Sequence, residues 1–126
     1  MSGAVLVVRP TSDNRLFVYL LRGQRRRSVS VSAPKLDQVL LPLIAKILKM
    51  TGAKPTQLSA IGLAQSPMSL ASQRLAVSVV NALGWAWGLK VFAHRGEVTA
   101  SNMAKSCQQA KKGFLRAEYS TEPRIG

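Results

Sequence analysis

Residues that could perform acid–base or nucleophilic chemistry are few in this chain. It has one histidine, His94, one cysteine, Cys107, and five acidic residues among its 126. General acid–base catalysis needs a titratable group positioned beside the reacting atoms, and Glu97 is the only acid close to His94 in the sequence. The sequence contains no CxxC pair, no HExxH motif and no Walker motif. It therefore predicts no catalytic residue, no metal site and no cofactor.

Two further polar residues stand at the start of an apolar helical segment. Ser69 lies between an apolar run and this segment, where a nucleophile elbow carries its serine, but the G-x-S-x-G pattern is missing. We therefore expect Ser69 or Ser66 to cap the helix. Arg74 is the only charged residue of the segment, and we expect it to form a structural ion pair with Asp13, Asp37 or a partner's carboxylate. Contact with a bound anion is the alternative for Arg74.

The chain is strongly basic. It carries 18 Lys and Arg against five acids, a formal net charge of +13. Such a field attracts polyanions, so nucleic acid is an expected neighbour. A charge that maintains solubility, or that complements an acidic partner protein, is the alternative. The candidate nucleic-acid-binding residues are two basic runs, one at a predicted hairpin tip and one near the C-terminus: Arg25, Arg26, Arg27, Lys111 and Lys112. For the first run, a solvated hairpin tip is the competing interpretation.

The pattern of apolar residues predicts a mixed α/β fold with a five-stranded sheet and two main helices. Apolar or alternating runs predict strands over 5–8, 16–21, 28–32, 59–64 and 90–93, and helical patterns cover 35–50 and 69–87. Three meandering strands followed by helical crossovers require a mixed sheet. We expect this unit to span 1–95. A basic tail over 96–126 follows it, with a short helix at 101–112 and a strand at 114–119.

Membrane and secretory features are not visible in the sequence. No apolar run reaches the roughly 18 residues that a membrane span needs, and the apolar run near the N-terminus is too short for a signal peptide. One cysteine alone makes no internal disulfide, which fits a reducing compartment. We therefore expect a cytoplasmic protein without a membrane partner.

The two predicted helices are apolar over more of their circumference than covering a sheet requires. One face can lie on the sheet, and the other then needs a partner. Trp85 and Trp87 project to nearly opposite sides, so one should be buried and the other exposed. Without another partner, a homodimer through the same helices is expected. The candidate partner-binding residues, three from each helix, are Leu40, Leu43, Ile47, Val80, Leu83 and Trp87.

The segment that joins the fourth strand to the second helix carries a recognisable pattern. From Ser66 to Val77 it reads S-P-M-S-L-A-S-Q-R-L-A-V, which resembles the G-P-G-S-F-T-G-L-R-I-G-V signature of the TsaB family. Pro67, Ser69 and Arg74 fall on the proline, serine and arginine of that signature in register. The resemblance covers about residues 4–94. Shorter segments similar to the family lie at 11–12, 40–44 and 81–84.

The resemblance implies the fold of one half of the actin-like, ribonuclease-H-like proteins and a part in tRNA threonylcarbamoyladenosine formation. The family's subunit is non-catalytic, and its two helices pack against those of the catalytic paralogue, TsaD, and hold that paralogue competent. The four glycines of the signature are replaced here by Ser66, Met68, Ser72 and Ala76. Because glycines let a backbone approach phosphate closely, we expect a degenerate nucleotide loop.

Two other functions stay open. The usual second half of the family's duplicated fold is almost absent from this sequence, where a tail of about 30 residues stands in its place, too short for a domain. A basic nucleic-acid-binding protein that reuses the fold, with tRNA as one ligand, is the main alternative. A nucleotide-hydrolysing enzyme is the least favoured, because a nucleotide pocket would need both halves and the glycines.

Overall fold

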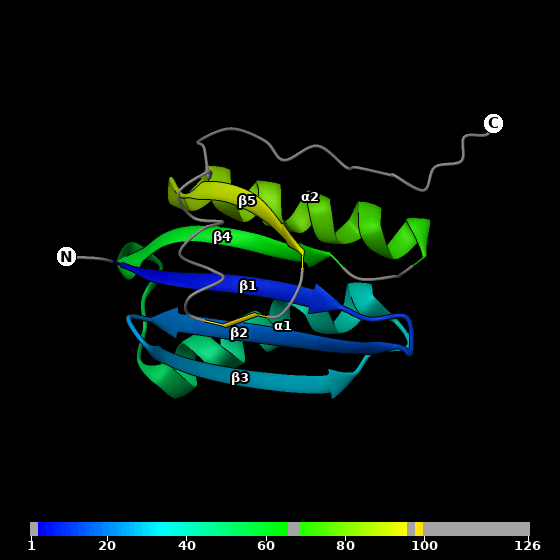
Figure 1. Ribbon diagram of the computed structural model, residues 1–126. Coiled ribbons are helices and arrows are strands. Elements are labelled where there is room, and N and C mark those ends of the chain that lie inside the picture. The colour runs from blue at the N-terminus through cyan, green and yellow to red at the C-terminus, as the bar shows by residue number, and fades with distance from the viewer. Residues whose placement is uncertain (1–2, 66–68, 96–97, 100–126) are drawn as a thin grey trace.

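A computed structural model describes residues 3–65, 69–95 and 98–99 of the chain. Figure 1 shows one layer of strands with helices behind it. The elements in chain order are β1 (Ala4–Pro10), β2 (Arg15–Arg22), β3 (Arg25–Ser32), α1 (Leu36–Thr51), the short 3-10 helix η1 (Pro55–Gln57), β4 (Leu58–Gln65), α2 (Leu70–Trp87) and β5 (Lys90–Arg95).

The strands form one five-stranded mixed sheet in the order β3-β2-β1-β4-β5. The first three strands pair antiparallel, as consecutive strands joined by short turns do. The β1–β4 and β4–β5 pairs are parallel, and each follows a helical crossover. The predicted fold class, a mixed sheet with two main helices, is therefore confirmed.

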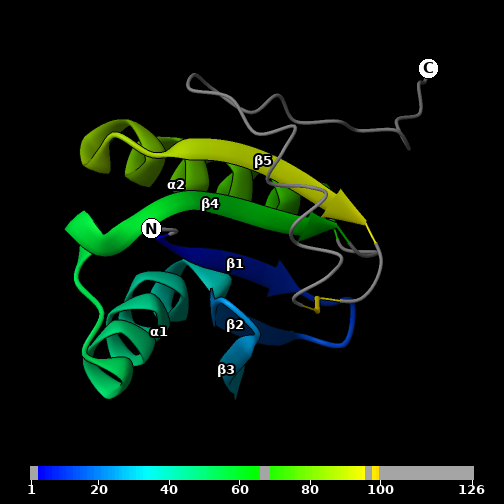
Figure 2. The same ribbon diagram turned by 60° about the vertical axis from the view of Figure 1, so that its left-hand side comes forward.

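Both helices cover the same face of the sheet. Helix α1 packs on β2 and β3, helix α2 packs on β4 with further contacts to β1 and β5, and the two helices touch each other. Figure 2 shows this arrangement from the side, with α1 and α2 on one side of the strands. We call this the helix face of the sheet and the opposite one the far face.

The helix ends follow from local chemistry. The Ser69 side chain caps α2, because its Oγ accepts a hydrogen bond from the Ser72 backbone N–H at 3.1 Å. Glycines in the left-handed region end both helices, Gly52 at φ 72° and Gly88 at φ 67°. Helix α1 continues through Pro42. The predicted capping role of Ser69 is confirmed.

Two apolar clusters lie on the two faces of the sheet. The cluster on the helix face contains fully buried side chains from the sheet and from both helices, among them Leu6, Val18, Ile47, Ile61 and Val80. The cluster on the far face is smaller and more aromatic. Its buried members are Val7, Tyr19, Leu21, Ala60, Ala64, Phe92 and Val98.

Glycine at two positions permits close packing. A Cβ on Gly62 of β4 would lie 2.3 Å from the ring of Phe92 on β5, and a Cβ on Gly84 of α2 would lie 2.5 Å from Val91 Cγ1. Real Cβ atoms do not approach other atoms this closely, so both contacts depend on the missing side chain.

Two predicted element bounds were wrong. The basic run Arg25–Arg27 belongs to β3, and the hairpin tip is only Gly23 and Gln24, because the antiparallel register continues to the Arg22–Arg25 pair. Strand β5 extends to Arg95, so His94 lies within the strand and is buried. The predicted helix at 101–112 and strand at 114–119 lie outside the described residues. The described helices include none that is long and apolar enough to cross a membrane.

Candidate functional site

The described part of the family-like segment lies at the N-terminus of α2. Ser69 caps the helix, and its hydroxyl also donates to Ser72 Oγ at 3.1 Å. Ala76 is fully buried against the sheet, whereas Arg74 is exposed. Of the two predicted settings for an Arg74 ion pair, buried or at an edge, the exposure of Arg74 leaves the edge. Ser66, Pro67 and Met68 lie outside the described residues.

The structure places most of the predicted partner-binding residues inside the chain. Leu40, Leu43, Ile47 and Val80 are at most 6% exposed and belong to the core on the helix face. A side chain buried there offers no surface to a partner, so the choice of these four is corrected. The other two, Leu83 and Trp87, are partly buried and pack against the same core.

The outer surface of the two helices carries a different set of apolar side chains. Trp85 on α2 is 78% exposed, and Leu41 on α1 is 52% exposed. Met50 and Leu70 are each 46% exposed. The prediction that one of the two tryptophans is buried and the other exposed is confirmed in direction, since Trp87 packs on the core. We call Leu41, Met50, Leu70 and Trp85 the outer helix set.

The surroundings of Trp85 on α2 are nearly uncharged. The other exposed positions of the helix after Leu70 carry small residues apart from Arg74: Ala71, Ser78, Ala82 and Ala86. Small side chains allow another helix to approach closely, and a large exposed aromatic residue is the type that anchors protein interfaces. A helical-wheel projection of the α2 sequence could have identified this exposed face, because Trp85 falls on the same arc as Ser78 and Ala82.

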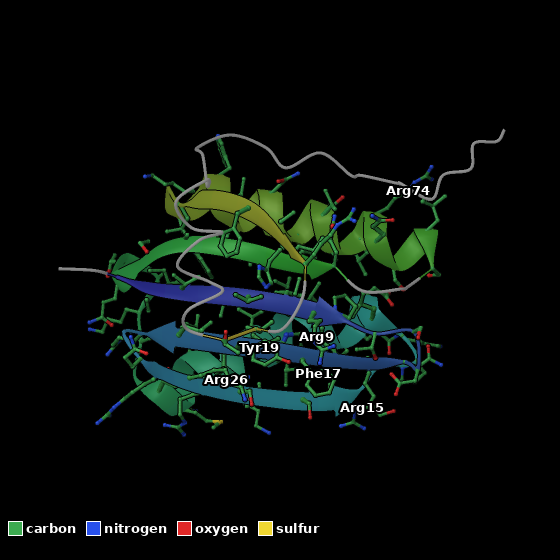
Figure 3. All side chains as sticks on the ribbon, in the orientation of Figure 1. Arg9, Arg15, Phe17, Tyr19, Arg26 and Arg74 are labelled. Carbon is green, nitrogen blue, oxygen red and sulfur yellow. The ribbon has the colours of Figure 1, made fainter. Side chains whose placement is uncertain are left out.

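A second group of candidate functional side chains lies on the far face, over β1, β2 and β3. The Arg9 guanidinium carbon lies 4.5 Å from the centre of the Phe17 ring and 6.0 Å from that of Tyr19. The two rings are stacked with their centroids 6.3 Å apart. Arg15 lies 5.9 Å from the Phe17 ring, and Arg26 lies 5.5 Å from the Tyr19 ring. Figure 3 shows these five side chains together, with Arg74 apart beside α2.

Hydrogen bonds hold the three arginines of this group in place. Arg9 Nε donates to Tyr19 Oη at 3.2 Å, and Arg15 Nη2 donates to Ser30 Oγ at 3.2 Å. Arg26 Nη1 donates to the backbone carbonyl of Val98 at 2.8 Å. We call Arg9, Arg15, Phe17, Tyr19 and Arg26 the arginine–aromatic group.

The predicted nucleic-acid-binding run is divided between the two faces. Arg26 pairs with Leu21 and lies on the far face, while Arg25 and Arg27 pair with Arg22 and Leu20 and project to the helix face. The three arginines therefore do not form one patch. Strand alternation could have shown this, because residues two apart share a face. Lys111 and Lys112 lie outside the described residues.

The candidate catalytic groups form no constellation in the described part of the chain. His94 is 7% exposed within β5, and Cys107 lies outside the described residues. Among the residues described, no three His, Cys, Asp or Glu side chains gather as metal ligands would.

Comparison with known proteins gives matches among solved structures. No protein-family model matches the chain, and no curated protein matches it. YeaZ from Pseudomonas aeruginosa is similar, with a TM-score of 0.67 and 29% identity over 75% of this chain and 44% of that one. A second structure, an uncharacterized protein with similarity to peptidase YeaZ from Pseudomonas aeruginosa, matches with the same TM-score, identity and coverage. The chain thus spans less than half the length of these proteins.

The similarity to YeaZ is one of sequence as well as of fold. YeaZ is a TsaB protein. The 29% identity and the shared fold both refer to a region that covers 75% of this chain. The resemblance of this chain to the TsaB family, first indicated by its signature segment, is thereby confirmed by its structure.

Proposed function

We propose that this chain is a non-catalytic subunit of the TsaB type, which acts in tRNA threonylcarbamoyladenosine formation by pairing its helix layer with the helices of a catalytic TsaD-like paralogue. It acts in the cytoplasm, where its single cysteine stays reduced. The family resemblance supplies the pathway and the mode of pairing. The observation that carries the pairing is the 78% exposure of Trp85 on the outer surface of α2.

The outer helix set supports a helix-to-helix contact. Both helices lie on one face of the sheet, so their outer surfaces form one layer that a second pair of helices can cover. Exposed apolar side chains come from α1 and from both ends of α2. Burying them would remove apolar area from water, worth roughly 25 cal/mol for each Å².

The start of α2 supports the non-catalytic assignment. A family glycine is replaced by Ser72, whose N–H is bonded to the Ser69 side chain. Another is replaced by Ala76, which is packed in the core. A backbone N–H that already donates to a capping side chain is less available to a phosphate. Side chains at these positions also keep a phosphate farther from the backbone than glycines would.

The pairing is tested by sedimentation velocity with the TsaD-like paralogue from the same cell. The wild-type chain should form a heteromeric complex, and Trp85→Glu should weaken it by at least about thirtyfold, because an interface anchor is lost and a carboxylate is buried. Without the paralogue, the same variant should dissociate a homodimer.

The matched control is Lys90→Gln, which makes the same change in net charge at an exposed position on the far face. This variant should bind the paralogue as the wild type does. Two results would contradict the proposal: no complex with the wild-type chain, or equal weakening by both substitutions.

A further inference from the structure

The arginine–aromatic group is not used by the proposed pairing, because it lies on the opposite face of the sheet from both helices. On β2 the residues Arg15, Phe17, Tyr19 and Leu21 alternate with residues of the helix-side core. Their partners on β3 are Ser32, Ser30, Ser28 and Arg26, in that order. The far face of β2 and β3 therefore carries arginines at both ends and a row of serines between them.

This surface is accessible over part of its area. Arg15, Arg26 and the serines Ser28, Ser30 and Ser32 are exposed, Phe17 is half-buried, and Tyr19 is only 7% exposed. From Arg15 to Leu21 the strand advances about 20 Å, and from β1 to β3 the sheet is about 10 Å wide. A surface of this length and width fits one extended polymer strand.

The described charges of this surface are all positive. Among the described residues the only acids are Asp13, in the turn between β1 and β2, and Asp37, in α1. No described acid therefore lies on the strands, and the arginines of this face are not neutralised from within the sheet. The whole chain has a net charge of +13, which adds to the attraction for a polyanion.

The arginines are held in position before any ligand binds. Each guanidinium has five N–H donors, and the contacts with described residues use one in each case. Stacking on Phe17 and Tyr19 restricts the Arg9 side chain, and the rings similarly flank Arg15 and Arg26. A restricted arginine loses less side-chain entropy when it binds phosphate, because part of that entropy is already lost.

We propose that the arginine–aromatic group, together with the Ser28 and Ser30 hydroxyls, binds the phosphodiester backbone of single-stranded RNA. Arginines bind the phosphates. A serine hydroxyl can both donate to and accept from a ribose 2′-hydroxyl, which favours RNA over DNA. Because Arg9 covers Phe17, recognition is of the backbone rather than of base identity. This inference does not rest on the proposed pairing through the helices.

The test is binding of oligo(U) RNA by the full chain, measured by fluorescence anisotropy across a salt series. The variant is Arg15→Gln with Arg26→Gln. Each lost phosphate contact lowers affinity by about tenfold, and the slope of log affinity against log salt should fall by about 1.4 for two contacts on a single strand.

The control variant is Arg22→Gln with Arg27→Gln. It removes the same charge from exposed positions on the same two strands but on the helix face. It should change affinity by less than about threefold, since only the general field is altered. Phe17→Leu keeps the charge and should weaken binding several-fold without changing the salt slope, because only the positioning of Arg9 is lost.

Circular dichroism confirms that each variant is folded before binding is compared. Equal weakening by the two double variants would overturn the proposal, since net charge alone would then explain binding. Equal or tighter binding of oligo(dT), of duplex RNA or of polyglutamate would overturn the assignment to single-stranded RNA. Loss of RNA binding in the first variant with the helix pairing intact would separate this inference from the proposed function.

Discussion

The guanidinium of Arg9 lies 4.5 Å from the centre of the Phe17 ring, and the two residues are direct partners across β1 and β2. The contact joins a half-buried arginine to a half-buried aromatic ring on the face without helices. It keeps a cation over an apolar cluster that would otherwise present ring surface to water.

This contact should be measurable as a coupling energy. In a double-mutant cycle with Arg9→Met and Phe17→Leu, we expect about 0.5–1 kcal/mol of coupling in the free energy of unfolding. Urea denaturation of the four proteins gives the value. A coupling within error of zero would mean that the two side chains stabilise the sheet independently.

Leu43 and its near neighbour Leu41 should respond oppositely to a charge, because Leu43 is 6% exposed and Leu41 is 52% exposed. Leu43→Glu buries a carboxylate in the core and should unfold the chain. Leu41→Glu should keep the wild-type circular-dichroism spectrum. A folded Leu43→Glu protein would show that the face of α1 is assigned backwards.

Gly84→Ala tests the close approach of α2 to β5. Alanine is favoured over glycine by about 1 kcal/mol in a helix, but its Cβ would lie 2.5 Å from Val91 Cγ1. Overpacking costs typically about 1–3 kcal/mol, so we expect net destabilisation in urea. The same change in a Val91→Ala background should be neutral or stabilising, and failure of that rescue would contradict the explanation.

Ser69→Ala should destabilise the chain by about 1 kcal/mol, since the N–H of Ser72 loses its acceptor. Ser69→Asp keeps an acceptor and should restore most of the stability. The urea midpoints of the two variants decide the matter: equal midpoints would show that the cap contributes nothing.

The sequence predicted the order and type of the elements because apolar periods and turn residues are local signals. The strand around Val5–Val8, the cap at Ser69 and the helix over 69–87 are examples. The prediction of which helix faces point outward was wrong, and the reason is physical. Where more than half of a helix is apolar, periodicity alone does not show which side meets the sheet, so the buried Leu40 and Ile47 were taken for contact residues.

The arginine–aromatic group was missed because it forms only when three strands are brought into register. Arg9, Arg15 and Arg26 are far apart in the sequence, and each looks like an ordinary surface charge. The short turn at Gly23 and Gln24 sets Arg26 on one face and its two neighbours on the other. Reading the basic run as a turn hid that alternation.

The most direct test of the central claim is the rate of threonylcarbamoyladenosine formation on tRNA by the TsaD-like paralogue, with and without this chain. The account predicts that the wild-type chain raises the rate, that Lys90→Gln does so equally, and that Trp85→Glu fails to do so while remaining folded. A rate that is the same with and without the wild-type chain would contradict the claim that this protein is a subunit of that machinery.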